Sequence, residues 1–374
     1  MNDDIFNFLL ITSGIHGIIF NIITLTFYKK KKISKAIIYL NLLVLSISLN
    51  NLQAWLISKD YSSSWFLIKN LEVPWYLFIL PMFYSFLIHF LLIENKYRKI
   101  GNFFILIFLI ETSIRLILIT YCYNISSDIV LIKSYTQIEE IINAFLSVTV
   151  FIKSYKIIFK EQHNYQYALS FDDVTWLKQF IVLGSLVLTL WFVAIIANIH
   201  LKIPQRNMYY PLRIGSSLLL YWIGYQGFLR YNVMSDRIHL RKEILKNKAS
   251  YQTHHKPKTE SNSLLFENIC KYIETNKTFL NPNVNLDNVS KDLQISSSHL
   301  SKIINKNHNL NFTDLINEYR VDHAKTLLLN PNFNNYTIIA IGLESGFNSK
   351  STFYNAFKKF TSQTPSGFRS KNSE

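Results

Sequence analysis

The stretch that decides the fold of the C-terminal part is residues 337–369, TIIAIGLESGFNSKSTFYNAFKKFTSQTPSGFR. Its pattern predicts a helix, a tight turn, a second helix and a short closing helix. Gly346 can supply the positive φ that the turn needs, and Ser349 can cap the second helix. The second helix also carries phenylalanines at helical spacing that must face a core, namely Phe353, Phe357 and Phe360.

The opposite face of this second helix is polar and carries Lys350, Ser351, Asn355 and Lys358. A helix of this kind can enter the major groove of DNA, where polar side chains meet base edges and lysines meet phosphates. On this stretch alone, an ordinary amphipathic surface helix remains the alternative.

The order of residues in GFNSKSTFYNAFKKFTSQTPSGFR resembles the signature of the AraC/XylS transcription regulators, whose DNA-binding domain holds two helix-turn-helix units. NFTDLINEYRVDHAKTLL, residues 311–328, looks like the linker helix of that family. Gly342 stands where the family usually has Ala, and Ser362 where it usually has Gly. The resemblance covers residues 264–369, under a third of the chain.

A first helix-turn-helix unit, which matches the family pattern less closely, is predicted at residues 286–306. A short amphipathic helix is followed by a turn at Ile295 and Ser296, where Ser296 can cap the next helix. That next helix places Leu300, Ile303 and Ile304 inward. The unit departs from the family pattern at two positions, Ser290 in place of Ala and Gln294 in place of Gly.

The resemblance implies base-reading positions in both units: Ser298, Ser301 and Lys302 in the first, and Lys350, Ser351 and Asn355 in the second. Asn355 could pair bidentately with adenine. Backbone anchoring is expected from Lys306, Lys358 and Lys359. Two recognition helices on one linker helix would enter successive major-groove faces one DNA turn apart, so double-stranded DNA is the expected partner. The alternative is that several of these side chains touch only solvent.

The composition indicates a chain that is part membrane and part cationic. The 374 residues carry a net charge of +15, yet 49% are hydrophobic and only 17% are charged. The two cysteines are far apart, which predicts neither a disulfide framework nor a zinc site. The sequence shows no phosphate-binding loop, nucleophile elbow or paired metal-ligand motif. We therefore expect a protein that is not an enzyme and that needs no cofactor or metal.

Seven apolar runs approach membrane-spanning length, at residues 5–28, 36–57, 74–93, 103–121, 138–159, 176–199 and 208–228. Basic clusters follow the odd-numbered runs, at residues 29–32, 96–99, 153–160 and 230–242. By the positive-inside rule this alternation predicts an N-terminus outside and a C-terminus inside. The expected location is the bacterial cytoplasmic membrane, with the DNA-binding part in the cytoplasm.

Two charged residues, Glu111 and Arg115, lie in the middle of the fourth run. They are four residues apart, so they share a helix face and can neutralise each other. A charge at mid-bilayer costs roughly 2.5–3.5 kcal/mol on insertion scales, so both should point into the bundle. They form either a ligand or ion site or an internal structural pair. Glu139 and Glu140 are expected at the outer interface.

The expected fold is all-α, with three regions: a seven-helix transmembrane domain at 1–229, a basic helix and flexible linker at 230–262, and a double helix-turn-helix domain at 263–374. The function expected is that of a membrane-bound transcription regulator whose bundle senses a small-molecule or membrane-derived signal. Homodimer formation is left open. The alternatives are a transporter or channel with a basic regulatory tail, and a bundle that serves only as an anchor.

Overall fold

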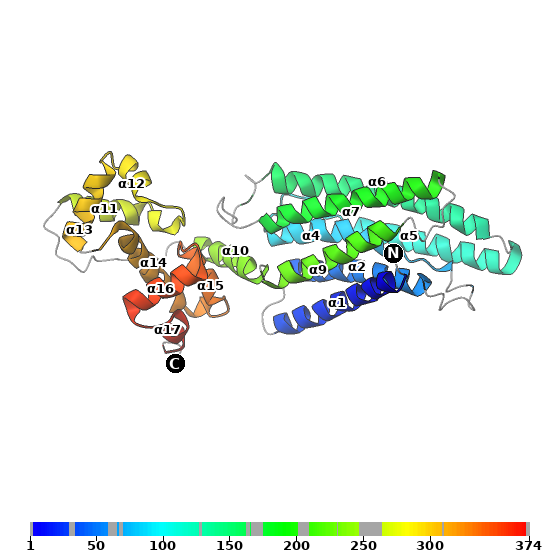
Figure 1. The fold of residues 1–374 in the computed structure, drawn as a ribbon, viewed down its shortest axis with the longest axis horizontal. Helices are drawn as coiled ribbons and strands as arrows, with labels where there is room; N and C mark the ends of the chain where they lie inside the picture. Colours follow the sequence, from blue (N-terminus) through cyan, green and yellow to red (C-terminus); the bar gives the residue numbers. More distant parts are fainter. Residues whose placement is uncertain are drawn as a thin grey trace. The chain divides into compact units, whose positions relative to one another are not determined.

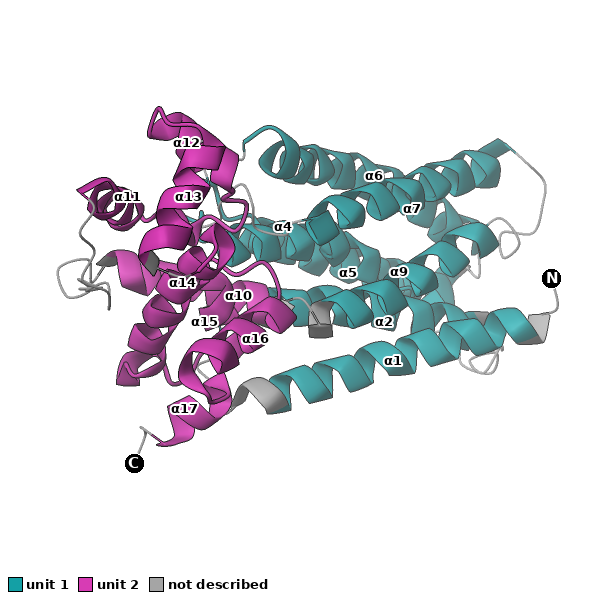
Figure 2. Cartoon of the chain, turned by 60° about the vertical axis from the view of Figure 1, so that its left-hand side comes forward, with its two compact units in different colours: residues 1–231 teal, residues 232–374 magenta. Residues whose placement is uncertain are grey.

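A computed structural model gives the fold of the chain (Figure 1). The structure describes residues 3–29, 34–58, 66, 70–126, 129–161, 165, 175–200, 209–229, 231–246, 264–308 and 310–371. Within these ranges all regular structure is helical and no strand occurs, which confirms the all-α prediction. Contacts divide the chain into two compact units, Met1–Tyr231 and Asn232–Glu374 (Figure 2).

The first unit is a bundle of long helices. Its elements are α1 (Asp3–Lys29), α2 (Lys35–Ser58), η1 (Trp75–Phe78), α4 (Ile79–Phe90), α5 (Gly101–Tyr121), η2 (Cys122–Ser126), α6 (Ile129–Phe159), α7 (Thr175–His200) and α9 (Tyr210–Leu229). By length and composition five segments could cross a membrane: Ile5–Thr26, Lys35–Ile57, Gly101–Ile125, Ile129–Phe159 and Thr175–His200.

Two of the seven apolar runs fall outside that set of five. The third run forms the shorter apolar segment Trp75–Phe90, although a straight span needs about 20 residues. The seventh run forms α9, whose apolar character is diluted by Arg213, Ser216 and Gln226. The count of seven spans therefore stays a prediction. The basic residues 30–32 and the loop lysines Lys59, Lys69 and Lys202 lie outside the described residues, as does Arg206.

The outer surface of the first unit is apolar. Large side chains on its helices are widely exposed, including Phe8 at 68%, Ile117 at 68% and Phe145 at 70%. In water such a surface would cost free energy over a large area, whereas lipid accepts it. The long apolar helices are thus compatible with membrane insertion.

Hydrogen bonds between polar side chains connect α1, α2 and α9 inside this unit. Asn51 on α2 donates to Ser13 on α1 at 3.0 Å and to Ser217 on α9 at 3.2 Å, and it accepts a hydrogen bond from Ser216 at 3.0 Å. All four residues are at least half-buried. Hydrogen bonds of this kind stabilise helix packing where water is absent.

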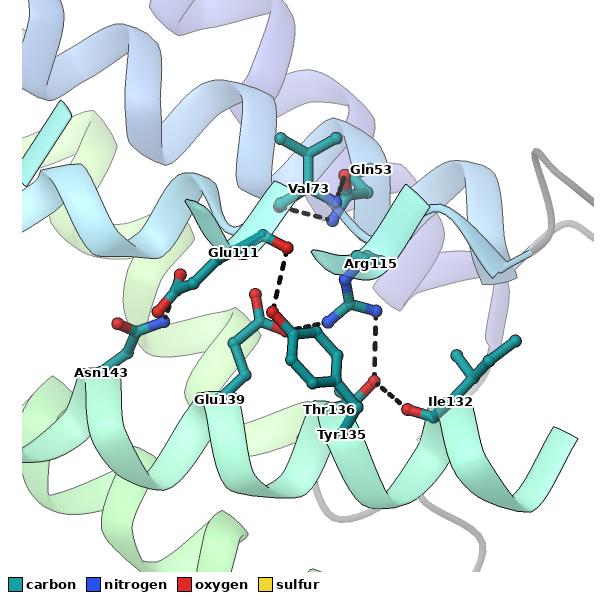
Figure 3. Close-up of polar contacts among 9 residues, drawn as sticks. All are labelled: Gln53, Val73, Glu111, Arg115, Ile132, Tyr135, Thr136, Glu139 and Asn143. Atoms are coloured by element: carbon teal, nitrogen blue, oxygen red, sulfur yellow. Dashed lines mark hydrogen bonds and ion pairs between the residues drawn. The ribbon is translucent and has the colours of Figure 1, made fainter. Parts of the chain in front are cut away.

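The charged residues of α5 have different partners from those that the sequence suggests (Figure 3). Arg115 pairs with Glu139 on α6 and donates to Thr136 at 3.1 Å. Glu111 accepts a hydrogen bond from Asn143 at 3.0 Å. The predicted mutual pairing of Glu111 and Arg115 is therefore corrected, because the cross-helix carboxylate lies nearer to the guanidinium. Both residues do point into the bundle, where their exposed fractions are 8% and 2%.

The acidic residues at the start of α6 also differ from expectation. Glu139 and Glu140 are 2% and 8% exposed, so neither lies at an outer interface. They face the interior because α6 packs against α4, α5 and α7 along this side. The interior of the bundle consequently holds more carboxylates than the sequence analysis places there.

The second unit contains two apolar cores that share one helix. Its elements are α10 (Tyr231–Lys246), α11 (Leu264–Thr275), η4 (Thr278–Leu280), α12 (Leu286–Asp292), α13 (Ser297–His308), α14 (Phe312–Leu328), η5 (Pro331–Phe333), α15 (Ile338–Glu344), α16 (Lys350–Thr361) and α17 (Pro365–Lys371). The first half of α14 packs with α11–α13, and its second half packs with α10 and α15–α17.

Helix α10 belongs to the second unit. The sequence assigns residues 230–262 to a connector, but Leu240 of α10 is fully buried in the second core and Ile244 packs against it. The remainder of the expected linker, residues 247–263, lies outside the described residues.

Candidate nucleic-acid interface

The turn between α15 and α16 has the geometry that its residues predict. Gly346 has a φ of 96°, in the region that favours glycine. The Ser349 hydroxyl accepts a hydrogen bond from the backbone N–H of Thr352 at 3.1 Å and so caps α16. At the start of α15, Thr337 caps in the same way by accepting from Ala340 N–H.

Helix α16 presents one buried and one exposed face. Phe353 and Phe357 are almost fully buried, while Phe360 is half-buried at the edge of the core. The residues that the sequence predicts for base reading and phosphate contact on this helix are exposed: Lys350, Ser351, Asn355, Lys358 and Lys359. The apolar stripe therefore holds the helix in place while its polar side chains stay accessible.

The lysines of α16 are not equivalent. The Lys350 ammonium lies 5.5 Å from the centre of the Tyr354 ring, which steadies it at the start of the exposed face. The Lys359 ammonium instead forms an ion pair with Asp314 of α14 at 2.6 Å. Lys359 thus joins two helices in this structure, and a phosphate contact from it would require that pair to open.

The predicted first helix-turn-helix unit, at residues 286–306, presents its predicted residues in a similar way on α13. Ser296 caps this helix by accepting from His299 N–H at 3.2 Å. Ser298, Lys302 and Lys306 are exposed, and Ser301 is half-buried. The structure thus puts these four side chains on the accessible side of the helix whose apolar residues fill the first core.

Two of the four departures from the AraC/XylS pattern have a visible physical basis. The Ser290 hydroxyl lies 3.0 Å from that of Ser297, which gives the short helices α12 and α13 a hydrogen bond that Ala would lack. A Cβ on Gly342 would lie 2.3 Å from the buried ring of Phe353, so Gly is required beneath this ring position. Gln294, the third departure, follows α12 and has a φ of 57°, in the left-handed region that favours glycine.

Ser362, the fourth departure, ends α16 with a φ of 58°. We expect Ser362→Gly and Gln294→Gly each to raise the free energy of unfolding by about 0.5–1 kcal/mol, because a left-handed conformation costs a non-glycine residue about 1–2 kcal/mol and glycine loses part of this through backbone entropy. Urea unfolding of a fragment spanning residues 232–374 measures both changes. Ser298→Gly, within helix α13, is the control and should be destabilising. If neither Ser362→Gly nor Gln294→Gly raised the urea concentration at the unfolding midpoint, the left-handed conformation at these two positions would be contradicted.

A buried arginine connects α14 to the segment that follows α11 and to the turn between α15 and α16. Arg320 of α14 donates to the carbonyl of Phe279 at 2.8 Å and to that of Asn281 at 2.9 Å. Its guanidinium also lies 5.7 Å from the ring of Phe347, in the turn of the second unit. Burial lowers the pKa of Arg320 to about 10, which still leaves it charged at neutral pH. This role is not among those predicted from the sequence, where its signal is an arginine amid the apolar residues of α14.

A histidine reinforces the same joint. His323 lies 3.2 Å from the hydroxyl of Ser345, again between α14 and the second turn. Burial lowers the pKa of His323 to about 4, so its ring is neutral at neutral pH. Together Arg320 and His323 tie α14 to the segment that follows α11 and to the turn between α15 and α16.

Comparison with known proteins gives this part of the chain a family. Residues 289–371 match the family model described as a helix-turn-helix domain. These residues form a helix-turn-helix domain of the AraC type. An uncharacterized HTH-type transcriptional regulator of Staphylococcus aureus strain MSSA476 is 32% identical over 118 residues, which are 32% of this chain and 15% of that protein.

Other known proteins are similar to a comparable share of the chain. An uncharacterized HTH-type regulator of Pseudoalteromonas carrageenovora is 32% identical over 108 residues, covering 29% of this chain and 60% of that protein. The C-terminal domain of the two-component response regulator yesN from Fusobacterium nucleatum is 30% identical, covers 29% of this chain and 99% of that chain, and has a TM-score of 0.26. This chain therefore shares only a small part of the length of the Staphylococcus relatives.

Proposed function

We propose that this protein is a membrane-bound, sequence-specific DNA-binding regulator of transcription. The observation that carries the proposal is the exposed polar face of α16, held by a buried phenylalanine stripe inside a helix-turn-helix domain. The similar proteins support the same reading, because each is described as an HTH-type transcriptional regulator.

Base recognition would come from both exposed helices. The side-chain amide of Asn355 can donate to and accept from adenine in the major groove, and Lys350 can reach guanine or a phosphate. Ser298, Ser301 and Lys302 would act in the same way from α13, while Lys306 and Lys358 contact phosphates. Because α13 and α16 pack against the two halves of α14, one monomer could read two successive faces of one site.

The first unit would hold the protein in the bacterial cytoplasmic membrane. Five long apolar helices and their exposed apolar surface support this, and the basic clusters favour an outside N-terminus and a cytoplasmic DNA-binding domain. DNA must then come to the membrane. The bundle would sense a signal or serve as an anchor, and α10, which directly follows α9 in the chain, is the segment through which a signal would reach the second helix-turn-helix unit.

Loss of base contacts on α16 should weaken DNA binding selectively. We expect Asn355→Ala to weaken binding to a selected site by about 5- to 150-fold, since a bidentate base contact is worth about 1–3 kcal/mol. Lys350→Ala should reduce the affinity further, and this further reduction should be smaller at high salt. Fluorescence anisotropy with a site enriched from random DNA, at two salt concentrations, measures both.

Lys325→Ala is the matched control, because Lys325 is a basic residue of the same unit that pairs with Asp322 on α14. Its affinity should stay within about threefold of the parent protein. An absence of salt-dependent binding by residues 232–374, or equal affinities for the parent and the Asn355→Ala Lys350→Ala variant, would refute the proposed function.

A further inference from the structure

The interior of the first unit holds a cavity of about 580 Å³. Side chains from α1, α2, α4, α5, α6, α7 and α9 line it, and the segment before α4 closes part of its wall. This volume lies in the range of sites that enclose a small organic molecule. Most of the lining is apolar, so a bare metal ion or a sugar would fit it poorly.

One carboxylate in the cavity wall makes hydrogen bonds but no direct ion pair. Glu140 is 8% exposed, and its two oxygens accept hydrogen bonds from Trp191 Nε1 at 3.0 Å and from the Tyr209 hydroxyl at 2.7 Å. Both donors are neutral, so they orient the carboxylate without neutralising it, and the Arg213 guanidinium that acts on its charge also acts on Glu72. In the described part of the chain no ion pair within 4.0 Å joins Glu140 to a cation.

Aromatic rings surround this carboxylate. The Tyr76 ring meets that of Trp191 edge to face, with centroids 5.4 Å apart, and both residues line the cavity. Phe180 lines the same space from α7. Aromatic faces next to a carboxylate attract an organic cation, through the quadrupole of each ring and through direct charge attraction.

The charges around the cavity also favour a cation. Arg115 is neutralised by Glu139, as Figure 3 shows, and Glu111 lies in the same network. Among the other lining residues, the carboxylates of Glu72 and Glu140 exceed the single guanidinium of Arg213. An anionic ligand would therefore add to an existing excess of negative charge, whereas a monovalent cation would reduce it.

We propose that this cavity binds a hydrophobic organic cation, with its charge against Glu140 and its apolar body against the side chains of α7 and α9. The inference rests on the proposed function only in making this cation the signal that the regulator senses. The cation is defined by its chemistry: one delocalised or alkylated positive charge on an apolar frame that fits within the cavity.

The test compares two ions of equal size and shape but opposite charge. Tetraphenylphosphonium and tetraphenylborate are measured separately on the full-length protein in lipid nanodiscs, with protein-free nanodiscs as the blank. We expect saturable binding of the phosphonium alone. Glu140→Gln should weaken that binding at least tenfold, and Glu94→Gln, which changes a carboxylate outside the cavity, should leave it unchanged.

A second variant keeps the test decisive if Glu140→Gln does not fold. Gly184 lines the cavity, and a Cβ there would meet no atom within 4 Å, so Gly184→Phe should fill the space and abolish binding without altering the charges. Size-exclusion profiles verify folding of each variant. Absent binding, equal binding of both ions, or binding that survives in folded Glu140→Gln or Gly184→Phe protein would overturn the inference. DNA binding by residues 232–374, measured in parallel, tests the proposed function independently.

Discussion

Gly346→Ala should lower the free energy of unfolding of residues 232–374 by about 2–5 kcal/mol, which is enough to unfold a marginal domain and abolish DNA binding. The residue has a φ of 96°, which L side chains rarely adopt. An added Cβ would also lie 2.1 Å from the carbonyl oxygen of Phe279 and 3.0 Å from Nε of Arg320. Since that carbonyl accepts the Arg320 hydrogen bond, the clash falls where the segment after α11 meets α14 and the turn between α15 and α16.

Denaturant unfolding followed by circular dichroism measures the loss, and anisotropy at low temperature shows whether the remaining folded protein binds DNA. Gly367→Ala is the control in the same domain, because its Cβ would approach only the Thr364 hydroxyl, at 3.2 Å, inside helix α17. The control should change stability by less than about 1 kcal/mol. A Gly346→Ala protein as stable as Gly367→Ala would show that the turn relaxes freely and that the joint is not tight.

Glu344→Ala should cost about 3–5 kcal/mol, the second large effect, because it removes the carboxylate that faces two buried arginines of α10. Arg241 donates to both oxygens of Glu344, at 2.6 and 2.8 Å, and Arg237 lies 3.5 Å from the same carboxylate. All three side chains are at most 10% exposed. Asp236 adds a hydrogen bond to the backbone N–H of Thr337 at 2.8 Å, so α10 is tied to both ends of α15.

A triple variant separates the cost of a broken ion cluster from the value of the cluster itself. Replacing Arg237 and Arg241 by Met together with Glu344 by Leu removes every charge at once, and such replacements are often neutral or stabilising. We therefore expect Glu344→Ala to be clearly less stable than the triple variant, by urea unfolding of residues 232–374. A loss below about 1 kcal/mol for Glu344→Ala would mean that α10 is not a firm part of this unit.

The ion cluster bears on the proposed signalling, because α10 lies between α9 and residues 247–263 in the chain. If α10 is docked by Glu344, then a change in the bundle can act on the second helix-turn-helix unit without passing through residues 247–263. Helices α12 and α13 come after residues 247–263 in the sequence. Helices α13 and α16 would then differ in how directly a structural change in the bundle reaches them.

The local pattern of the sequence determined the helix-turn-helix geometry on its own. The phenylalanine spacing of α16, the cap at Ser349 and the glycine at position 346 depend only on neighbours a few residues away, and each prediction is confirmed. The departures at Gln294 and Ser362 likewise marked two positions where the backbone is left-handed. Local steric rules suffice for these features because no distant residue is needed to satisfy them.

Partner choice among charged side chains was decided only by the tertiary structure. Spacing predicts that Glu111 and Arg115 can meet, but packing of α6 brings Glu139 to Arg115 instead. Arg237 and Arg241 count in the sequence as part of a basic cluster beside the membrane, yet the fold buries both against Glu344, more than 100 residues later. Burial of a charge requires a partner, and which carboxylate supplies it depends on how distant helices pack. The sequence by itself therefore determined the helices and their faces, and the packing of those helices decided where the charges are held.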